Sequence, residues 1–422
     1  MKDNWKKMPI GEVCKSYAGG TPNRSNPTYY GGEIPWISSG EVNQAYITDT
    51  KEKITKEGLR FSSAKMIPKE AILLAMYGAT AGQVSKLKID ATANQAVLAL
   101  IPDDADDYFI YHELNFIKNR ILFLAQGSGQ PNLSKSLIDQ TLIDCPPLPQ
   151  QRKIANILST CDEVIEKTEA AIAKYQALKQ GMMHDLFTSG IDVKTGKLRP
   201  SYQDAPELYK ESELGMIPKD WDVSELETFT NYVDYRGKTP PKADKGIFLI
   251  TAKNIKFGFI DYEISKEYIP TAAYKTAMSR GISEIGDVLI TTEAPMGNVA
   301  QINIEGLALA QRVIKYRCYP NEMLNDFLKH SMMAEYFQKE LEAESTGSTV
   351  KGIKGSRLHL LNVMKPSILE QEKIVHGLAP VEAKIEAEQS ALAKYQQIKA
   401  GLMQDLLTGN VEVSVAEEIL KN

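Results

Sequence analysis

Hydrophobic positions are most regular in two long stretches, residues 148–190 and 368–410. In each, apolar residues recur at alternating spacings of four and three, which is typical of a coiled-coil seam sustained over about five heptads. About 40 helical residues at 1.5 Å each reach about 60 Å, longer than a small domain is wide. The pattern therefore predicts two long helices that bury their apolar stripes against each other. The seam positions are Ile154, Leu158, Cys161, Ile165, Ile172, Tyr175, Met182 and Leu186, then Ile374, Leu378, Val381, Ile385, Leu392, Tyr395, Leu402 and Leu406.

These two stretches are copies of one another. They align without gaps at a constant offset of 220, with 17 of 43 positions identical, most densely over residues 173–190 and 393–410. Sparser matches indicate that the globular blocks that precede the two helices are also duplicated. If the helices pair antiparallel, a pseudo-two-fold axis then relates the two halves of the chain. The matches are Trp5 with Trp221 and Gln95 with Gln311 at offset 216, Thr21-Pro22 with Thr239-Pro240 at 218, and Gly127-Ser128 with Gly347-Ser348 at 220.

Each globular block has an α/β pattern. In the first, the apolar runs AILLAMYG (71–78) and NQAVLALI (94–101) alternate with Gly-, Asn- and Pro-rich turns, and a helix is predicted from 107 to 125.

Pro380 is expected to start or kink the second long helix. The predicted fold class is α+β, with two α/β domains joined by two long antiparallel coiled-coil helices. The predicted segments are a first domain (1–147), a first helix (148–190), a polar linker (191–215), a second domain (216–366), a second helix (367–410) and a tail (411–422).

Composition restricts the class of protein only broadly. The chain of 422 residues is 43 % hydrophobic and 24 % charged, which is ordinary for a globular protein. No apolar run reaches the roughly 18 residues of a membrane span, and the N-terminus lacks a signal-peptide core, so a cytoplasmic protein is expected. The four cysteines lie far apart and are expected to be free thiols. A net charge of −5 mildly disfavours nucleic acid as a binding partner, but this holds only for the surface as a whole and not for local clusters of lysine and arginine.

Several motifs in a fixed order resemble the specificity subunits of type I restriction–modification enzymes over essentially the full chain. They are GGTP (19–22), IPWISSGEV (34–42), PPLPQQRKI (146–154), YKESELGMIPKDWDV (209–223), ILEQEKI (368–374) and the two related helix ends. The resemblance implies a non-catalytic subunit in which each globular block is a target-recognition domain that reads one half of a split, asymmetric double-stranded DNA site. It also implies that the helices space the halves and dock DNA methyltransferase subunits, two in number, with restriction or translocase subunits as further partners. S-adenosylmethionine, ATP and Mg are then expected only in those partners, in a bacterial or archaeal cytoplasm.

Motifs for chemistry within the chain are incomplete. Asn26-Pro27-Thr28-Tyr29 lacks the second proline of the (N/D)PP(Y/F) loop of DNA methyltransferases, and no glycine-rich cofactor loop follows a strand. Gly237-Lys238-Thr239 lacks the upstream glycine of a P-loop, because Tyr232 stands there. The five histidines show no metal-ligand spacing. No catalytic or metal site is therefore predicted. The alternatives are a self-contained methyltransferase with fused recognition domains and a coiled-coil scaffold that binds protein.

Candidate DNA contacts lie in polar loops that recur in both blocks. Residues 347–357 (GSTVKGIKGSR) carry three cations and no acid, which suits phosphate contact. Arg prefers guanine edges, and Asn or Gln prefers adenine edges. The alternative interpretation is that these loops are merely solvated surface. The candidates are Thr21, Asn23, Arg24, Gln126, Ser128, Gln130, Asn132, Ser134 and Lys135 in the first block, and Arg236, Lys238, Lys242, Ser348, Lys351, Lys354 and Arg357 in the second.

The helix ends provide a second set of candidates, for the helix seam and the partner interface. Tyrosines at matched positions are expected in the seam, and matched lysines are expected to extend to water or to pair with an acid. A glycine inside a helix costs about 1 kcal/mol relative to alanine, so its recurrence in both copies suggests close approach by another chain or domain. These residues are Tyr175, Lys179, Gly181, Met182, Tyr395, Lys399, Gly401 and Leu402.

Overall fold

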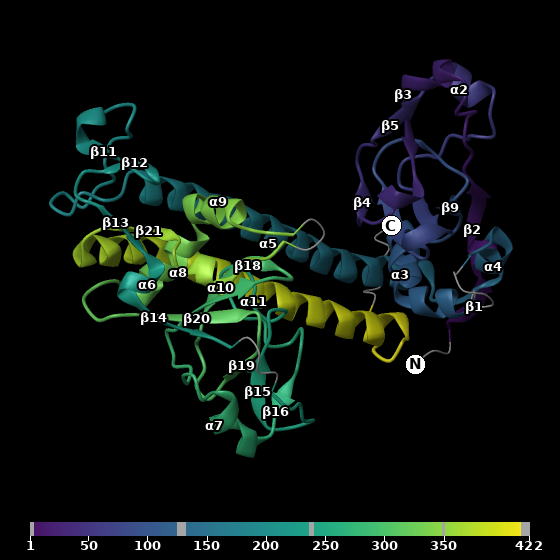
Figure 1. The fold of residues 1–422 in the computed structure, drawn as a ribbon. Helices are drawn as coiled ribbons and strands as arrows, with labels where there is room; N and C mark the ends of the chain where they lie inside the picture. The colour runs from purple at the N-terminus through teal and green to yellow at the C-terminus, as the bar shows by residue number, and fades with distance from the viewer. Residues whose placement is uncertain (1–3, 125–131, 236–239, 348–350, 415–422) are drawn as a thin grey trace, which may run out of the picture. The chain divides into compact units, whose positions relative to one another are not determined.

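A computed structural model describes residues 4–124, 132–235, 240–347 and 351–414 (Figure 1). The chain divides into two compact units, Met1–Ala170 with Glu388–Asn422, and Ala171–Ala387. The long helices α5 (Leu148–Thr188) and α11 (Ile368–Leu407) therefore each contribute one part to the first unit and the other part to the second. The sequence-based division instead treats each long helix as a segment separate from both domains. In the structure each part of a helix packs with its neighbouring domain.

In the first unit, a five-stranded sheet in the order β2-β9-β6-β7-β4 lies beside a three-stranded sheet, β5-β3-β8, and a β1-β10 pair. Helix α3 spans Asp107–Leu124, as the sequence pattern predicted. The strands are β1 (Lys6–Pro9), β2 (Cys14–Ala18), β3 (Tyr30–Ile37), β4 (Tyr46–Ile47), β5 (Glu52–Ile54), β6 (Ile72–Ala75), β7 (Val84–Leu87), β8 (Thr92–Ala93), β9 (Val97–Pro102) and β10 (Leu142–Cys145). The short helices are α1 (Ile10–Val13), α2 (Lys56–Arg60) and α4 (Lys135–Gln140).

Strand β6 shows why its sequence is apolar without interruption. Ile72 and Leu74 point into a cluster with helix α3, whereas Leu73 and Ala75 point into a second cluster with the β3 sheet. Successive side chains of a strand face opposite sides, so a strand covered on both faces is apolar throughout. The α3 cluster extends to Leu158 of α5 and Leu406 of α11. Helix α3 therefore packs between the sheet and the two long helices.

The second unit repeats this plan. Its sheets have the orders β14-β20-β17-β18, β16-β15-β19 and β13-β21, which correspond to β2-β9-β6-β7, β5-β3-β8 and β1-β10. Its strands are β11 (Tyr209–Ser212), β12 (Gly215–Pro218), β13 (Asp222–Glu225), β14 (Thr230–Asp234), β15 (Ile247–Ile250), β16 (Tyr268–Ile269), β17 (Val288–Thr292), β18 (Met296–Gln301), β19 (Ala308–Leu309), β20 (Val313–Cys318) and β21 (Asn362–Lys365). Its short helices are α6 (Leu226–Phe229), α7 (Tyr274–Ala277), α8 (Asn325–Met333), α9 (Glu335–Ala343) and α10 (Gly355–Leu358).

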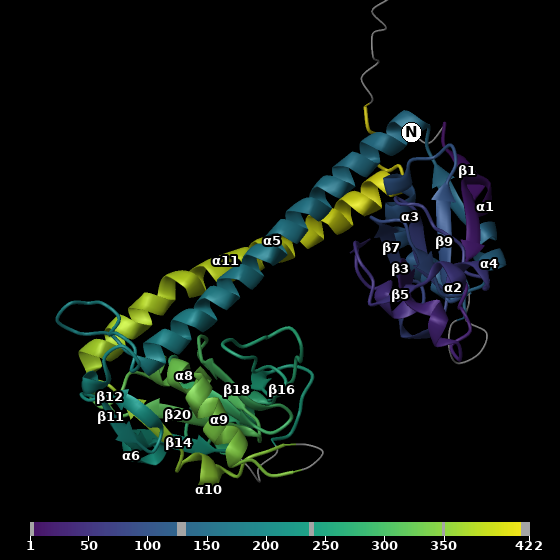
Figure 2. The same cartoon turned by 90° about the horizontal axis from the view of Figure 1, so that it is seen from above.

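The long helices run antiparallel within each unit (Figure 2). In the first unit Asp162 pairs with Lys399, and in the second Lys179 pairs with Glu382. Leu158 and Leu378, at matched positions of the predicted seam, are both fully buried. Together with the repeated sheets, this confirms the predicted α+β class with an internal duplication.

The structure bears on two further predictions. Helix α11 begins at Ile368 and continues through Pro380, so the prediction that the proline starts the helix is wrong, while a kink stays a prediction. The predicted linker ends inside a hairpin, since β11 and β12 pair across the predicted boundary at 215/216. Its beginning is held at the start of α11, where Glu370 accepts a hydrogen bond from the Ile191 amide at 2.8 Å and pairs with Arg199. The helices in the described ranges include none that is long and apolar enough to cross a membrane.

The seam predicts a matched pair of stability effects. Leu158→Ala and Leu378→Ala should each lower the free energy of unfolding by about 2–5 kcal/mol, because each truncation leaves a cavity at a fully buried position. Leu178→Ala, at a helix position that is 52 % exposed, is the control and should change it by less than about 0.5 kcal/mol. Urea denaturation of the three variants measures the difference. Equal changes in the free energy of unfolding at all three positions would contradict the burial of the seam.

Candidate nucleic-acid interface

Four loops of the first unit meet at one end of the strands of the five-stranded sheet. This end of the sheet, where the loops lie, is called its edge below. Because β2 and β6 both run antiparallel to β9, the ends of β2 and β6 lie beside the start of β9, with Ala18 opposite Leu98 and Ala75 opposite Val97. The loop that follows α3 returns to the same edge, where the Leu133 amide donates to the Met76 carbonyl at 3.0 Å. Polar segments far apart in sequence are therefore neighbours here.

The second unit builds the same edge. β14 and β17 end where β20 begins, with Asp234 opposite Ile314 and Thr291 opposite Val313. The Ile353 amide donates to the Thr292 carbonyl at 3.0 Å, which matches the bond between Leu133 and Met76 in the first unit. The duplicated fold thus presents two equivalent loop clusters, and residues 351–357 of the predicted basic loop belong to the second.

The GGTP segment is held closely against this edge. Gly19 and Gly20 donate to the carbonyls of Val97 and Ala93 at 3.0 and 2.8 Å. A Cβ on Gly20 would overlap the backbone of Ser63 and Ala64. Close backbone approach therefore explains the glycines. The predicted contact Thr21 follows directly, and its hydroxyl bonds the side chain of Gln95.

Arg24 is held beneath the same loop by aromatic rings and an acid. Its guanidinium lies 4.7 Å from the centroid of the Tyr30 ring and 4.8 Å from that of Trp36, and it pairs with Glu52 at 2.6 Å. The hydrogen bond to Glu52 raises the pKa of Arg24. The arginine is thus oriented by cation–π contacts, with part of its charge compensated within the chain.

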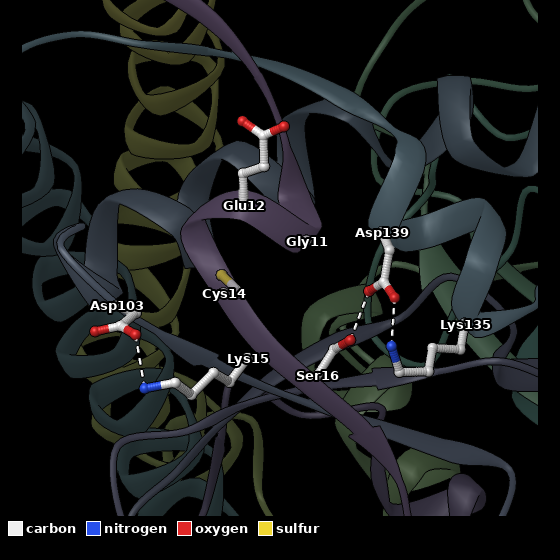
Figure 3. Close-up of a pocket in the computed structure, with 8 residues that line it drawn as sticks. All are labelled: Gly11, Glu12, Cys14, Lys15, Ser16, Asp103, Lys135 and Asp139. Atoms are coloured by element: carbon white, nitrogen blue, oxygen red, sulfur yellow. Dashed lines mark hydrogen bonds and ion pairs between the residues drawn. The ribbon is translucent and has the colours of Figure 1, made fainter.

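Other predicted contacts of the first block have local partners. The Asn23 side chain accepts from the Ser25 amide at 3.0 Å, and Ser134 caps α4 by accepting from the Leu137 amide at 3.1 Å. Asn132 is exposed. Lys135 points at Asp139 in a polar groove between β2 and α4, as Figure 3 shows. Gln126, Ser128 and Gln130 lie outside the described residues.

The basic loop of the second block is less positive than its sequence suggests. Lys351 pairs with Glu342, and Arg357 lies 3.8 Å from Glu344, because helix α9 brings acids beside a segment that itself contains none. Lys354 is exposed and has no ion pair with the part of the chain that the structure describes. Lys242, the other predicted DNA contact of the second block among the described residues, pairs with Glu267 at 2.7 Å. Arg236, Lys238 and Ser348 lie outside the described residues.

Sequence reasoning missed residues on both edges. Arg312, with a positive φ of 74°, pairs with Glu293 at 2.6 Å on the second edge. Gln95 and the partly exposed Tyr77 lie on the first. The sequence contained a signal for Arg312. Gln95 and Gln311 are a matched pair that aligns the two blocks, and Arg312 directly follows Gln311.

The helix candidates divide into a seam and an outer face. Tyr175, Met182, Tyr395 and Leu402 are half-buried, and Lys179 and Lys399 make the expected pairs with acids. Gly181 and Gly401 are exposed, and apart from the adjoining helix backbone no atom of the described residues lies within 4 Å of a Cβ built on either. Close approach at these glycines therefore does not come from within the described chain, and approach by another molecule stays a prediction.

The fold defines a duplicated protein in which each unit presents an equivalent loop cluster at the end of its main sheet. A sequence model of the type I restriction modification DNA specificity domain matches residues 2–174 and 218–399. The chain belongs to this family, and it is a non-catalytic DNA-specificity subunit of a type I restriction–modification system.

Individual relatives agree in length and architecture. The type I restriction enzyme MjaIX specificity subunit of Methanocaldococcus jannaschii is 32% identical, with 97% of this chain and 94% of that protein covered. The MjaVIII specificity subunit of the same organism is 25% identical, with the same shares covered. The crystal structure of the type I restriction–modification S subunit from M. genitalium has the same fold, with a TM-score of 0.59, 16% identity and 97% of each chain covered.

The close approach of the GGTP loop predicts a local effect on DNA binding. Gly20→Ala should displace the loop and weaken binding of the assembled complex to its DNA target at least about tenfold, or about 1.4 kcal/mol. Gly40→Ala is the control, because the nearest atom to its added Cβ would be the Ser38 hydroxyl at 3.9 Å. A folded Gly20→Ala complex that binds like the wild type would place this loop away from DNA. Fluorescence anisotropy with a labelled duplex measures both.

Proposed function

We propose that the two loop clusters read the two halves of one bipartite DNA site. The observation that carries this proposal is that equivalent edges of equivalent sheets present different side chains. At matched positions the first edge has Tyr77 and Ala96, whereas the second has Glu293 and Arg312. A tyrosine and an alanine offer different contacts to base edges from a glutamate and an arginine, so the two half-sites should differ in sequence.

The long helices supply the separation between half-sites and the docking face for partner subunits in this proposal. Each unit combines one recognition domain with part of both helices, so the length of the helices, and not either domain, sets the spacer. Two methyltransferase subunits fit a duplicated surface, because Gly181 and Gly401 occupy matched, open positions. Restriction or translocase subunits would be further partners.

Cofactor chemistry belongs to those partner subunits in this scheme. S-adenosylmethionine, ATP and Mg would bind there, and the complex would act in a bacterial or archaeal cytoplasm, where its DNA is found. The specificity-domain family match covers most of both units, which favours this function over a self-contained methyltransferase or a protein-binding scaffold.

The basic loop of the second block tests the proposed interface through salt dependence. Replacing Lys351, Lys354 and Arg357 by alanine should weaken DNA binding by the complex and reduce the salt slope, since each phosphate contact contributes about 0.9. The matched control removes three exposed lysines from the linker and the adjoining turn, Lys194, Lys197 and Lys219. Affinity measured across salt concentrations should show a smaller slope only for the first variant. An identical slope in both would place the loop away from DNA.

The spacing role is tested by lengthening both helices at matched positions. Four residues inserted after Glu169 and four after Gln389 add about 6 Å and rotate each helix by about 40° beyond one full turn. The seam then keeps its register on both sides of the insertion. With DNA rising about 3.4 Å per base pair, the preferred spacer should grow by one or two base pairs.

Methylation mapping of the lengthened complex gives the readout, and both half-site sequences should stay unchanged. A single insertion after Glu169 is the comparison, because it shifts the seam register and should also reduce stability. Altered half-site bases with an unaltered spacer would rule out the helices as the spacing element.

A further inference from the structure

A buried histidine, an acid and a lysine meet at matched positions in both units. In each unit the histidine belongs to the recognition domain, and the acid and the lysine belong to different long helices. The acids are related by the helix offset of 220, as are the lysines, and the histidines are related by 218. The two triads are His112, Asp162 and Lys399 in the first unit, and His330, Glu382 and Lys179 in the second.

The second triad is tightly bonded. His330 Nδ1 lies 2.7 Å from the Asp326 carbonyl, and its Nε2 lies 2.9 Å from Glu382 Oε1. Lys179 reaches the same carboxylate oxygen at 2.7 Å, and Lys329 lies 3.6 Å from the other. Burial alone would raise the pKa of Glu382, but the surrounding histidine and lysines hold it well below its usual value. One carboxylate therefore joins α8, α11 and α5.

The first triad has the same members in a looser form. His112 Nε2 lies 3.1 Å from the Ser159 hydroxyl, and Nδ1 lies 3.8 Å from Asp162 Oδ2, while Lys399 bonds the other carboxylate oxygen. Within the described chain, Nδ1 and Oδ2 are buried without a hydrogen-bond partner. The aspartate is one methylene shorter than Glu382, so its carboxylate does not reach the histidine.

Apolar packing by itself leaves the angle between a recognition domain and the helices weakly determined. Hydrophobic contact is non-directional, whereas a charge-assisted hydrogen bond requires a defined geometry. Buried ion pairs often add little net stability compared with apolar residues of similar volume, and their best-attested role is to specify register. His330 is 1 % exposed, so this junction lies inside the packed interface and not on its rim.

We infer that each triad is a positioning device that fixes the orientation of its recognition domain on the two long helices. The inference rests on the proposed reading of two half-sites. If a domain turns on the helices, its loop cluster moves relative to the DNA even though the loops themselves are unchanged. Loss of a triad should therefore relax the spacer requirement while base selectivity within each half-site is kept.

Three variants of the second unit test this: Glu382→Gln, Lys179→Met and the conservative Glu382→Asp. The control is Lys174→Met, which replaces an exposed lysine five residues away on the same helix as Lys179. Each is assembled with its methyltransferase subunits and assayed on duplexes that carry both half-sites at the native spacer and at one or two base pairs more or less. Circular dichroism confirms folding.

Glu382→Gln and Lys179→Met should reduce the preference for the native spacer at least tenfold, with unchanged selectivity for half-site bases. Glu382→Asp should lose only part of the preference, because an aspartate can keep the lysine pair, as Asp162 does, but is too short to reach the histidine, and Lys174→Met should keep all of it. A uniform loss of activity at every spacer, or an unchanged preference in folded variants, would overturn the positioning role. A wild-type complex without any spacer preference would instead refute the proposed two-half-site function.

Discussion

The structure depends on the burial of two apolar stripes that neither long helix can cover alone. Each stripe is extended over about 40 residues, and the copy of the same helix supplies the complementary surface. Antiparallel pairing places the start of each helix beside the end of the other. Each recognition domain can therefore pack against both helices at once, as the shared clusters around Leu158 and Leu378 show.

The recognition domains attach to this pair through a helix layer of the same design. α3 in the first unit, and α8 with α9 in the second, lie between a sheet and the long helices. Buried glutamines add matched polar links, since the Gln151 side chain accepts a hydrogen bond from the Asp106 amide at 2.9 Å and the Gln371 side chain accepts one from the Leu324 amide at 2.8 Å. The apolar layer provides the burial free energy, and these directional bonds together with the triads determine where each domain is attached.

At the edge of each sheet that carries the loop cluster, the backbone is alike in the two units but the side chains differ. Equivalent backbone bonds hold the loops, such as those from Leu133 to Met76 and from Ile353 to Thr292. The side chains between them differ, with Tyr77 in one edge at the position of Glu293 in the other. A rigid scaffold whose loops carry different exposed side chains can recognise different sequences, because those exposed side chains do not contribute to the core.

The sequence by itself determined the duplication, the two long helices, the α/β blocks and the family, because periodicity and offset are properties of the chain. It also placed Thr21 and the loop after α3 among the candidate contacts. Only the tertiary structure decided that Glu342 lies beside Lys351, that Arg312 joins the second edge, and that His330 meets Lys179 through Glu382. Those contacts join separate elements, so neither local spacing nor helical period contains the information that brings them together.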